Sequence, residues 1–196
     1  MPVPGLIIFG VVVLIVLIYV IGTYNRCIRL KNLVPESWSN VDTELKRRYD
    51  LIPNLVETVK GYAAHERTVL ESVIRARAAA VESTGSPESQ ARDENALVGT
   101  LKSLFAVAEG YPELKADRHF MHLQKQLVET ENRIQAARRF YNANVRDLNT
   151  ITEMFPSSLV AGMAGIGRAE YFETDDVALP DVSFAPPAPG GPSTTR

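Results

Sequence analysis

The sequence predicts an all-α protein with one N-terminal transmembrane helix followed by an antiparallel four-helix bundle. Three observations lead to this fold class. Residues 6–21 form an uninterrupted apolar run. From residue 35 to residue 155, apolar side chains recur at alternating spacings of three and four, the period of an amphipathic helix. No stretch shows the sustained alternation and β-branched enrichment that are typical of a strand.

The apolar run is long enough to cross a membrane. With its flanks it reaches about 20 residues, the length that spans a hydrocarbon core of about 30 Å. It lacks the polar face that a soluble helix requires. A cleaved signal peptide is disfavoured because no Lys or Arg precedes the run, and because Tyr19, Ile21, Tyr24 and Asn25 stand where a cleavage site needs small residues. We therefore predict a retained membrane anchor in residues 1–23, with the lipid-facing side chains Leu6, Ile7, Ile8, Val12, Leu14, Val16, Ile18 and Ile21.

The charges beside the anchor predict its orientation. Arg26, Arg29 and Lys31 follow the apolar run, and no side-chain charge precedes it. Because Lys and Arg resist translocation, we expect the N-terminus outside and the bundle in the cytoplasm, with the anchor in the inner membrane. The same three cations are placed to meet anionic lipid headgroups.

Residues 24–156 are predicted to form the bundle, and two prolines mark its first helices. Pro35 suits the first turn of a helix, where the missing N–H costs nothing. Pro53 removes the hydrogen bond to the carbonyl of Tyr49, so it kinks or ends the helix. We favour a break from Tyr49 to Pro53, with Asp50 capping a second helix that runs to about Glu82. The alternative is one long kinked helix.

Two further helices complete the predicted bundle. The third starts near Glu88, after a loop rich in Ser and Gly, and stops at residues 110–112. The fourth is capped by Asp117 and keeps its apolar heptad phase over residues 120–155. Short loops join the helices, and this favours antiparallel neighbours.

The chain changes character twice after the bundle. Residues 157–174 hold apolar side chains around three glycines, and we expect an apolar flap that folds onto the bundle or the membrane. These glycines do not match a phosphate-binding loop, because no strand precedes them and no Lys follows in the required place. Residues 175–196 are acidic and then rich in Pro, Gly, Ser and Thr, which predicts a disordered tail.

Composition excludes several classes of function. The 21 Lys and Arg residues nearly balance the 23 Asp and Glu residues, so no basic field indicates a nucleic-acid partner. Cys27 is the only cysteine, which excludes an internal disulfide and a site with several thiolate ligands.

His119 and His122 are the weak candidates for a metal site. They are spaced to share one helix face, but neither belongs to the Glu-x-x-His pattern of helical metal sites. Solvated or capping histidines are the favoured interpretation. We predict no metal ligand, no cofactor and no catalytic residue.

A polar cluster interrupts the helical pattern. Arg48 falls on the apolar stripe, where a cation must find a carboxylate, and Glu131 or Asp50 is the most plausible partner. Two interpretations stay open, of which the first is favoured: a salt-bridged layer that fixes the helix register, or an exposed groove that binds a partner. The cluster consists of Arg47, Arg48, Tyr49, Asp50, Glu131, Arg133, Arg138 and Arg139.

Several segments resemble the LemA family. They are residues 46–56 (KRRYDLIPNLV), 130–134 (TENRI) and 137–142 (ARRFYN), and the likeness extends to residues 104–109, 111–116 and 155–157. The resemblance covers about residues 24–173. It implies a bacterial or archaeal protein with one N-terminal membrane helix, a four-helix bundle and no established reaction. Ala164-Gly165-Ile166 departs from the aromatic-glycine-aromatic run common in the family, so no docking role of those aromatics carries over.

These observations predict a membrane-anchored helical scaffold or adaptor that presents a cytoplasmic bundle to protein partners and has no catalysis of its own. The expected partners are membrane lipid and an unidentified membrane or cytoplasmic protein, and a homo-oligomer is possible. One alternative is a metal- or ligand-binding bundle with enzymatic activity around His119 and His122. Another is a membrane-shaping protein that assembles through its bundle.

Overall fold

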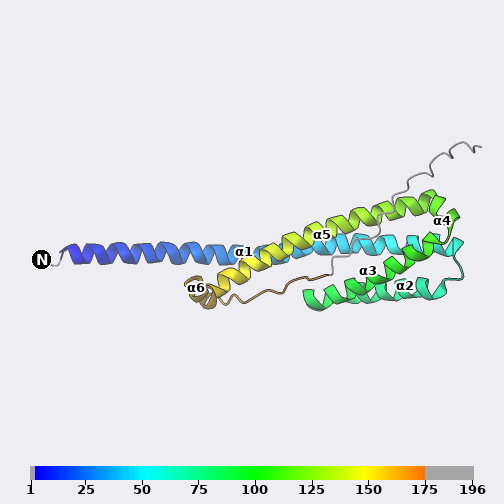
Figure 1. Cartoon of the computed structure of the whole chain (residues 1–196). Coiled ribbons are helices and arrows are strands. Elements are labelled where there is room, and N and C mark those ends of the chain that lie inside the picture. The colour runs from blue at the N-terminus through cyan, green and yellow to red at the C-terminus, as the bar shows by residue number, and fades with distance from the viewer. Residues whose placement is uncertain (1–2, 175–196) are drawn as a thin grey trace, which may run out of the picture.

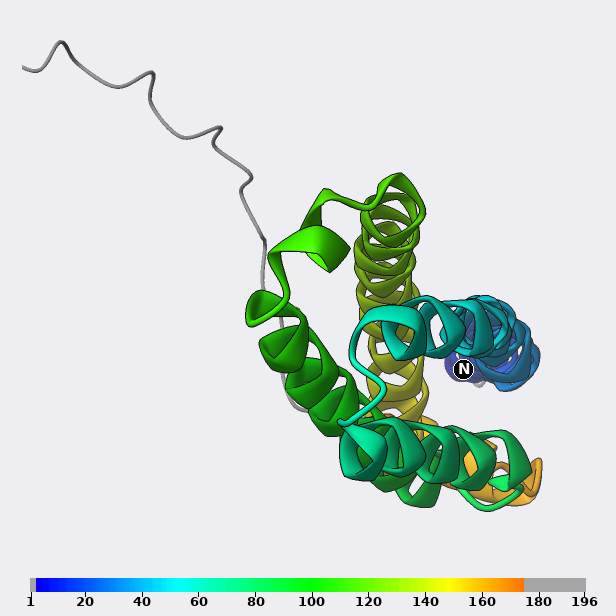
Figure 2. The ribbon, with the colours of Figure 1, turned by 90° about the vertical axis from the view of Figure 1, so that its right-hand side faces the viewer.

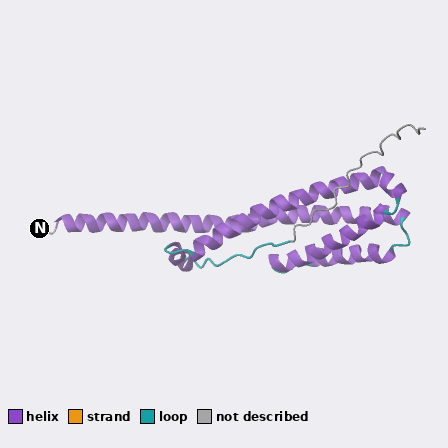
Figure 3. Ribbon diagram, in the orientation of Figure 1, coloured by secondary structure: helices purple, strands orange, loops and turns teal. Residues whose placement is uncertain are grey.

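The computed structural model describes residues 3–174, which form six helices. Four of them run alternately in opposite directions and form an antiparallel bundle, and the N-terminal part of the first projects from it as a rod (Figures 1 and 2). The described part of the chain contains no strand (Figure 3), so the all-α fold class is confirmed. The predicted tail, residues 175–196, lies outside the described residues. The helices are α1 (Val3–Tyr62), α2 (Arg67–Glu82), α3 (Pro87–Glu109), α4 (Pro112–Ala116), α5 (Arg118–Glu153) and α6 (Ser157–Met163).

The rod consists of the predicted membrane anchor. Every large apolar side chain in residues 6–21 is at least 37% exposed, and no other part of the bundle covers them. In the described residues, α1 is the one helix that is long and apolar enough to cross a membrane. Burial against the rest of the protein begins at Cys27. The chain therefore carries a candidate N-terminal transmembrane helix.

Neither proline begins or ends a helix, which corrects two predictions. α1 continues through Pro35 and through Pro53, where a break was favoured. The carbonyl of Tyr49 lacks its usual helical donor, because Pro53 has no N–H. Arg77 of α2 replaces that donor, and its Nε–H donates to the Tyr49 carbonyl at 2.8 Å. The long continuous helix, weighed as the alternative, is the one observed.

The first chain reversal comes instead at residues 63–66, within the predicted second helix. α2 starts at Arg67 and folds back, so that Leu70 and Val73 are buried in the core. A helix continuing straight on would pass the end of the bundle and leave these side chains in water. Two hydrogen bonds hold the reversal at the far end of the bundle: the Tyr62 hydroxyl to the Asp117 carboxylate, at 3.1 Å, and the Tyr111 hydroxyl to the Glu66 carboxylate, at 3.4 Å.

The later helix boundaries agree with the local signals. α3 ends at Glu109, directly before Gly110. Asp117 caps α5 by accepting a hydrogen bond from the Phe120 N–H at 2.8 Å. α1 packs mainly against α5, and α2 packs mainly against α3. The fully buried centre of the bundle includes Leu45, Ile52, Leu55, Leu97, Leu101, Leu104, Leu114 and Leu127.

The predicted flap lies against the bundle at the end nearest the rod. α6 contributes Ala161 to a second apolar cluster, which Cys27 and Leu30 of α1 and Leu148 and Ile151 of α5 complete together with Ile166. Residues 168–174, called the strap below, then run back along α5 toward the middle of the bundle (Figure 1). The strap ends beside the polar cluster predicted from sequence.

Candidate functional site

The structure divides the predicted polar cluster into two places. Arg48, Tyr49 and Glu131 are buried between helices. Arg138 is half-buried and reaches the strap, where it donates to the hydroxyl and the carbonyl of Thr174. The remaining members, Arg47, Asp50, Arg133 and Arg139, are exposed on the outside of the bundle.

The buried part is an ion-pair layer across the bundle. The Arg48 side chain is 1% exposed, and its Nη1 lies 2.8 Å from Oε2 of Glu131 on α5. Its Nη2 pairs with the carboxylate of Glu94 on α3. The neighbouring Tyr49 hydroxyl also donates to Glu94 and lies 3.3 Å from the carbonyl of Ala80 on α2. Arg48 and Tyr49 therefore connect α1 to the three other helices of the bundle.

The pairing of Arg48 with Glu131 is confirmed, whereas the alternative partner Asp50 is wrong because it is exposed. Glu94, the second carboxylate, was missed. Glu94 stands seven residues before Leu101, on the apolar stripe of α3. A charged residue at such a position is the pattern from which a buried carboxylate could have been predicted.

The ion-pair layer has no room for a substrate. The cavity beside Arg48, Glu94 and Glu131 measures about 10 Å³, which is close to the space of one water molecule. Burial raises the pKa of Tyr49, although the nearby Arg48 guanidinium opposes this rise. The phenol therefore stays a neutral hydrogen-bond donor. This arrangement joins helices and leaves no open position for chemistry.

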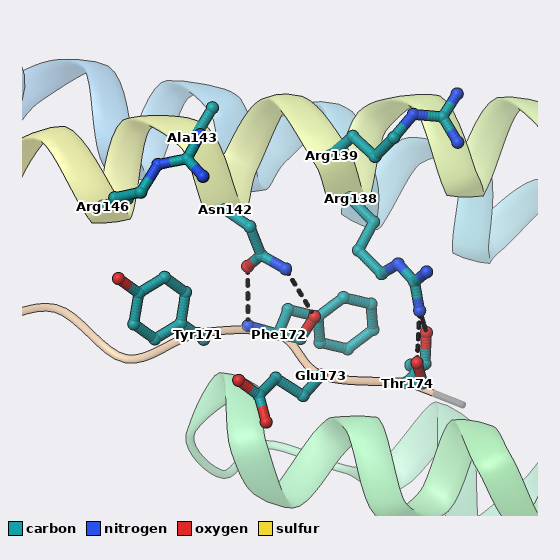
Figure 4. Close-up of a pocket in the computed structure, with 9 residues that line it drawn as sticks. All are labelled: Arg138, Arg139, Asn142, Ala143, Arg146, Tyr171, Phe172, Glu173 and Thr174. Carbon is teal, nitrogen blue, oxygen red and sulfur yellow. Dashed lines mark hydrogen bonds between the residues drawn. The ribbon is translucent and has the colours of Figure 1, made fainter. Parts of the chain in front are cut away.

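The surface part is a groove between α5 and the strap, shown in Figure 4 and called the arginine groove. Its volume is about 850 Å³. Arg138 reaches down to Thr174, whereas Arg139 points away from the strap (Figure 4). Within residues 3–174, neither Arg139 nor Arg146 forms an ion pair with a carboxylate. The groove is lined by Arg138, Arg139, Asn142, Ala143, Arg146, Tyr171, Phe172, Glu173 and Thr174.

Two asparagines of α5 hold the strap in register. The Asn142 side chain accepts from the N–H of Phe172 and donates to its carbonyl, both at 3.0 Å (Figure 4). Asn149 does the same to Ala169, at 2.8 and 3.0 Å. Seven residues of a helix rise about 10.5 Å, and three residues of extended chain span about 10 Å, so the two spacings match. Each asparagine replaces the backbone partners that a neighbouring strand would provide.

Aromatic side chains seat the end of the strap on the bundle. Phe172 is fully buried, and its ring meets that of Trp38 edge-on at a centroid distance of 5.2 Å. Trp38 meets Tyr141 in the same way at 5.1 Å. The Tyr141 hydroxyl donates to the carbonyl of Glu170 at 2.8 Å. Burial, together with the charge of Glu170, raises the pKa of Tyr141 to about 12.

A sequence model of the LemA family matches residues 37–184, which covers most of the bundle, α6 and the strap. The chain belongs to the LemA family. The resemblance found in the motifs is therefore confirmed.

Relatives of this LemA-family chain include proteins named for the magnetosome. Magnetosome protein MamQ 2 of Paramagnetospirillum magneticum is 28% identical, and the match covers 76% of this chain and 64% of the relative. Magnetosome protein MamQ of Magnetospirillum gryphiswaldense is 26% identical with the same coverage. Protein LemA of Metamycoplasma hominis is 23% identical, over 83% of this chain and 74% of that protein. The chain thus spans less than two thirds of the magnetosome relatives it matches.

The two candidate histidines of this LemA-family protein, His119 and His122, lie exposed at the start of α5. The Asp117 carboxylate beside them already accepts hydrogen bonds from Phe120 and Tyr62. The Phe120 N–H, more than any other group, lowers the pKa of Asp117. Among the described residues, no group of three or more His, Cys, Asp or Glu side chains is placed to hold a metal ion. The structure therefore does not bring His119 and His122 together with further ligands.

Proposed function

We propose that this LemA-family protein is a membrane-anchored helical scaffold, and that its bundle offers the arginine groove to an acidic segment of a protein partner. The observation that carries the proposal is the continuity of α1. One 60-residue helix contains both the exposed apolar rod and the core residues Leu45 and Ile52. A membrane helix that is also a core helix holds the bundle at a defined height and orientation. The proposal assigns the protein no catalysis of its own.

The chemistry of the groove favours a partner with carboxylates. Arg139 and Arg146 present two guanidinium groups on the outer face of α5, and each can bind a carboxylate through two parallel hydrogen bonds. An exposed ion pair contributes only about 0–1 kcal/mol, so recognition requires several contacts along the groove. The groove length between Arg139 and Arg146, seven residues of helix or about 10 Å, suits three residues of an extended peptide.

Site-specific photocrosslinking in native membranes tests the scaffold. The full chain carries the photoreactive residue at Arg139 or, as control, at the exposed Arg92 of α3. We expect one defined protein to crosslink from position 139 and not from position 92. Arg146→Glu should weaken that crosslink, because it introduces repulsion toward a carboxylate. Equal products from both positions, or lipid adducts alone from position 139, would overturn the proposal.

We further propose that the bundle lies in the cytoplasm. The support is the exposure of Arg26, Arg29 and Lys31 on α1, directly beyond the apolar span, where cations resist translocation. A cysteine replaces the exposed Lys102 in a Cys27→Ser chain, and intact cells receive a membrane-impermeant thiol reagent. We expect labelling only after the cells are opened. Labelling in intact cells would show that the bundle lies outside the cytoplasm and would contradict the proposed orientation.

A further inference from the structure

Four large apolar side chains are exposed at the end of the bundle nearest the rod. Met154 is 58% exposed, Phe155 79%, Leu159 62% and Met163 90%. They lie in the turn from α5 to α6 and along α6 itself, and we call them the apolar corner. Four such side chains gathered at one place on the bundle indicate a surface that is covered in the working protein.

α6 has two apolar faces, and the bundle covers one of them. Val160 and Ala161 are buried, and Ala161 packs in the cluster with Cys27 and Leu30 of α1. Leu159 and Met163 are four residues apart, so they share the opposite face of the helix. A short helix on a water-exposed surface would carry polar side chains there. The outer face of α6 is apolar although the protein itself leaves it open.

The position of α6 along α1 indicates what covers this face. A span of about 20 residues counted from Leu6 ends near Asn25. Cys27 then lies about 3 Å beyond the hydrocarbon edge, and Leu30 about 8 Å, at a rise of 1.5 Å per residue. The headgroup layer on each side of a bilayer is about 5–8 Å thick. Because α6 packs against these two residues, it lies at the depth of the headgroups.

The direction of α6 agrees with this depth. The helix is seen nearly end-on in Figure 1 and from its side in Figure 2, so its axis crosses that of α1. If α1 runs along the membrane normal, α6 lies along the membrane surface. A helix in that plane with its apolar side inward is the geometry of interfacial helices.

We propose that the apolar corner inserts into the interface of the same bilayer that α1 spans, so that the bundle contacts the membrane at two places. This inference rests on the membrane anchoring in the proposed function. Arg26, Arg29 and Lys31 are exposed on the adjoining part of α1 and add attraction to anionic headgroups. Arg168, at the same end, is paired with Glu153 at 2.9 Å. Because Glu153 already pairs with Arg168, we expect the apolar side chains of the corner, and not Arg168, to enter the interface.

Fluorescence quenching on the full chain tests the inference. The Cys27→Ser protein is reconstituted in vesicles of phosphatidylcholine and phosphatidylglycerol, with one environment-sensitive label on a new cysteine. Met163→Cys reports the corner, and Met121→Cys, at the far end of α5, is the matched control. Val16→Cys reports the span. Lipids carrying a nitroxide near the headgroup or deep in the chain serve as quenchers.

We expect the shallow quencher to reduce the emission at Met163→Cys to about half and that at Met121→Cys by less than about one tenth. If the deep quencher acts at Val16→Cys and neither quencher acts at Met163→Cys, the apolar corner does not insert, although α1 still spans the membrane. No quenching at Val16→Cys would contradict the proposal that α1 spans the membrane. A blue-shifted but unquenched label at Met163→Cys would mean that protein, such as a second copy of the chain, covers the corner, and the inference would be wrong.

A second variant keeps the anchor and changes only the corner. Leu159→Glu is made in a chain labelled at Met163→Cys, and the fold is retained because Leu159 is exposed. A charged side chain resists transfer into the interface, so quenching of the label should fall while that at Val16→Cys is unchanged. Unchanged quenching at Met163→Cys would contradict insertion of α6.

Discussion

Arg48 is held by carboxylates from two other helices, and each belongs to a residue distant from it in sequence. A guanidinium group offers five N–H donors and keeps its charge, so its burial requires acceptors on more than one side. Glu94 and Glu131 provide them from α3 and α5. Such a layer fixes the relative register of helices more than it adds to stability, because two desolvated partners must each lose their water.

Removing the arginine should therefore cost far more than the ion pairs contribute. We predict that Arg48→Ala lowers the free energy of unfolding by about 3–5 kcal/mol, since two buried carboxylates lose their partner. Arg47→Ala is the matched control, because Arg47 is half-exposed and pairs with Glu44 at 3.4 Å. Its cost should be about 0–1 kcal/mol. Urea unfolding in detergent measures both, and a loss below about 1 kcal/mol for Arg48→Ala would contradict a buried layer.

Tyr141 should make the stability fall at alkaline pH. Its pKa is raised to about 12 in the folded protein, chiefly by burial, against about 10 for an exposed phenol. The neutral phenol is thus favoured in the fold. Its contribution is complete below pH 10 and is lost as the pH rises through about 12. Tyr141→Phe should make this loss shallower in unfolding measurements from pH 9 to pH 12, whereas Tyr24→Phe, on the exposed rod, should not.

At the scale of elements, α1 shows how a proline is accommodated within a helix. Pro53 cannot donate to the Tyr49 carbonyl, and a buried carbonyl without a donor would destabilise the fold. Arg77 of α2 donates to it instead. Ile52 and Leu55, on either side of the proline, stay in the core and keep the helix axis in place. The carbonyl that Pro53 leaves without a donor in α1 thus accepts a hydrogen bond from α2.

This account predicts coupling between Pro53 and Arg77. Arg77→Ala should cost about 1.5–3 kcal/mol in the natural chain, the range for a hydrogen bond with a charged donor. In a Pro53→Ala background the new N–H can donate to Tyr49, so the same change should cost less, by at least about 0.5 kcal/mol. A double-mutant cycle measures the difference. The exposed Arg75→Ala is the control and should show no coupling.

The strap should loosen when its asparagine contacts are removed. Asn142→Ala deletes both hydrogen bonds to Phe172 and should increase hydrogen exchange at the Phe172 amide, because local opening then needs less energy. The exposed Asn132 lies on the same helix, and Asn132→Ala should leave that amide protected. Hydrogen exchange read by NMR or mass spectrometry distinguishes them. Equal exchange in the two variants would show that Phe172 is held by its ring alone.

At the scale of the whole molecule, α1 connects the membrane to the bundle without a hinge. Its 60 residues correspond to about 90 Å of helix. Roughly the first third is exposed and apolar, and the rest contributes the central core residues of the bundle. The apolar first third of α1 is therefore continuous with the rest of the helix but contributes no side chain to the core of the bundle.

Because the cores are separate, the bundle should fold without its span. We predict that deletion of residues 1–23 leaves the midpoint of urea unfolding unchanged and lowers the helical signal only by the share of the deleted turns of α1, since no large apolar side chain of residues 6–21 is buried in the bundle. The full chain in detergent is the reference, and circular dichroism measures both. Deletion of residues 1–40 is the contrasting variant, because it removes Cys27, Leu30 and Trp38. Unfolding of the shorter deletion would contradict separate cores.

The sequence by itself determined the features that depend on neighbouring residues. The apolar span needs only its composition, and the cap of α5 needs only Asp117 and an N–H three residues later. The end of α3 at Gly110 is similarly local. Arg48 could be recognised as buried and paired because it stands on a stripe of apolar residues. The longest LemA-family motif, residues 46–56, lies within α1, and residues 130–134 and 137–142 lie within α5.

Only the tertiary structure decided the features that depend on distant residues. Glu94 reaches Arg48 across 46 positions, whereas the nearby Asp50 points to solvent. Pro53 was expected to end a helix, because a sequence does not show that Arg77 will supply the missing donor. That Asn142 and Asn149 match the spacing of Phe172 and Ala169 is likewise seen only when the strap lies beside α5. Local rules describe the hydrogen bonds within a helix, but the partners between helices are known only once the chain has folded.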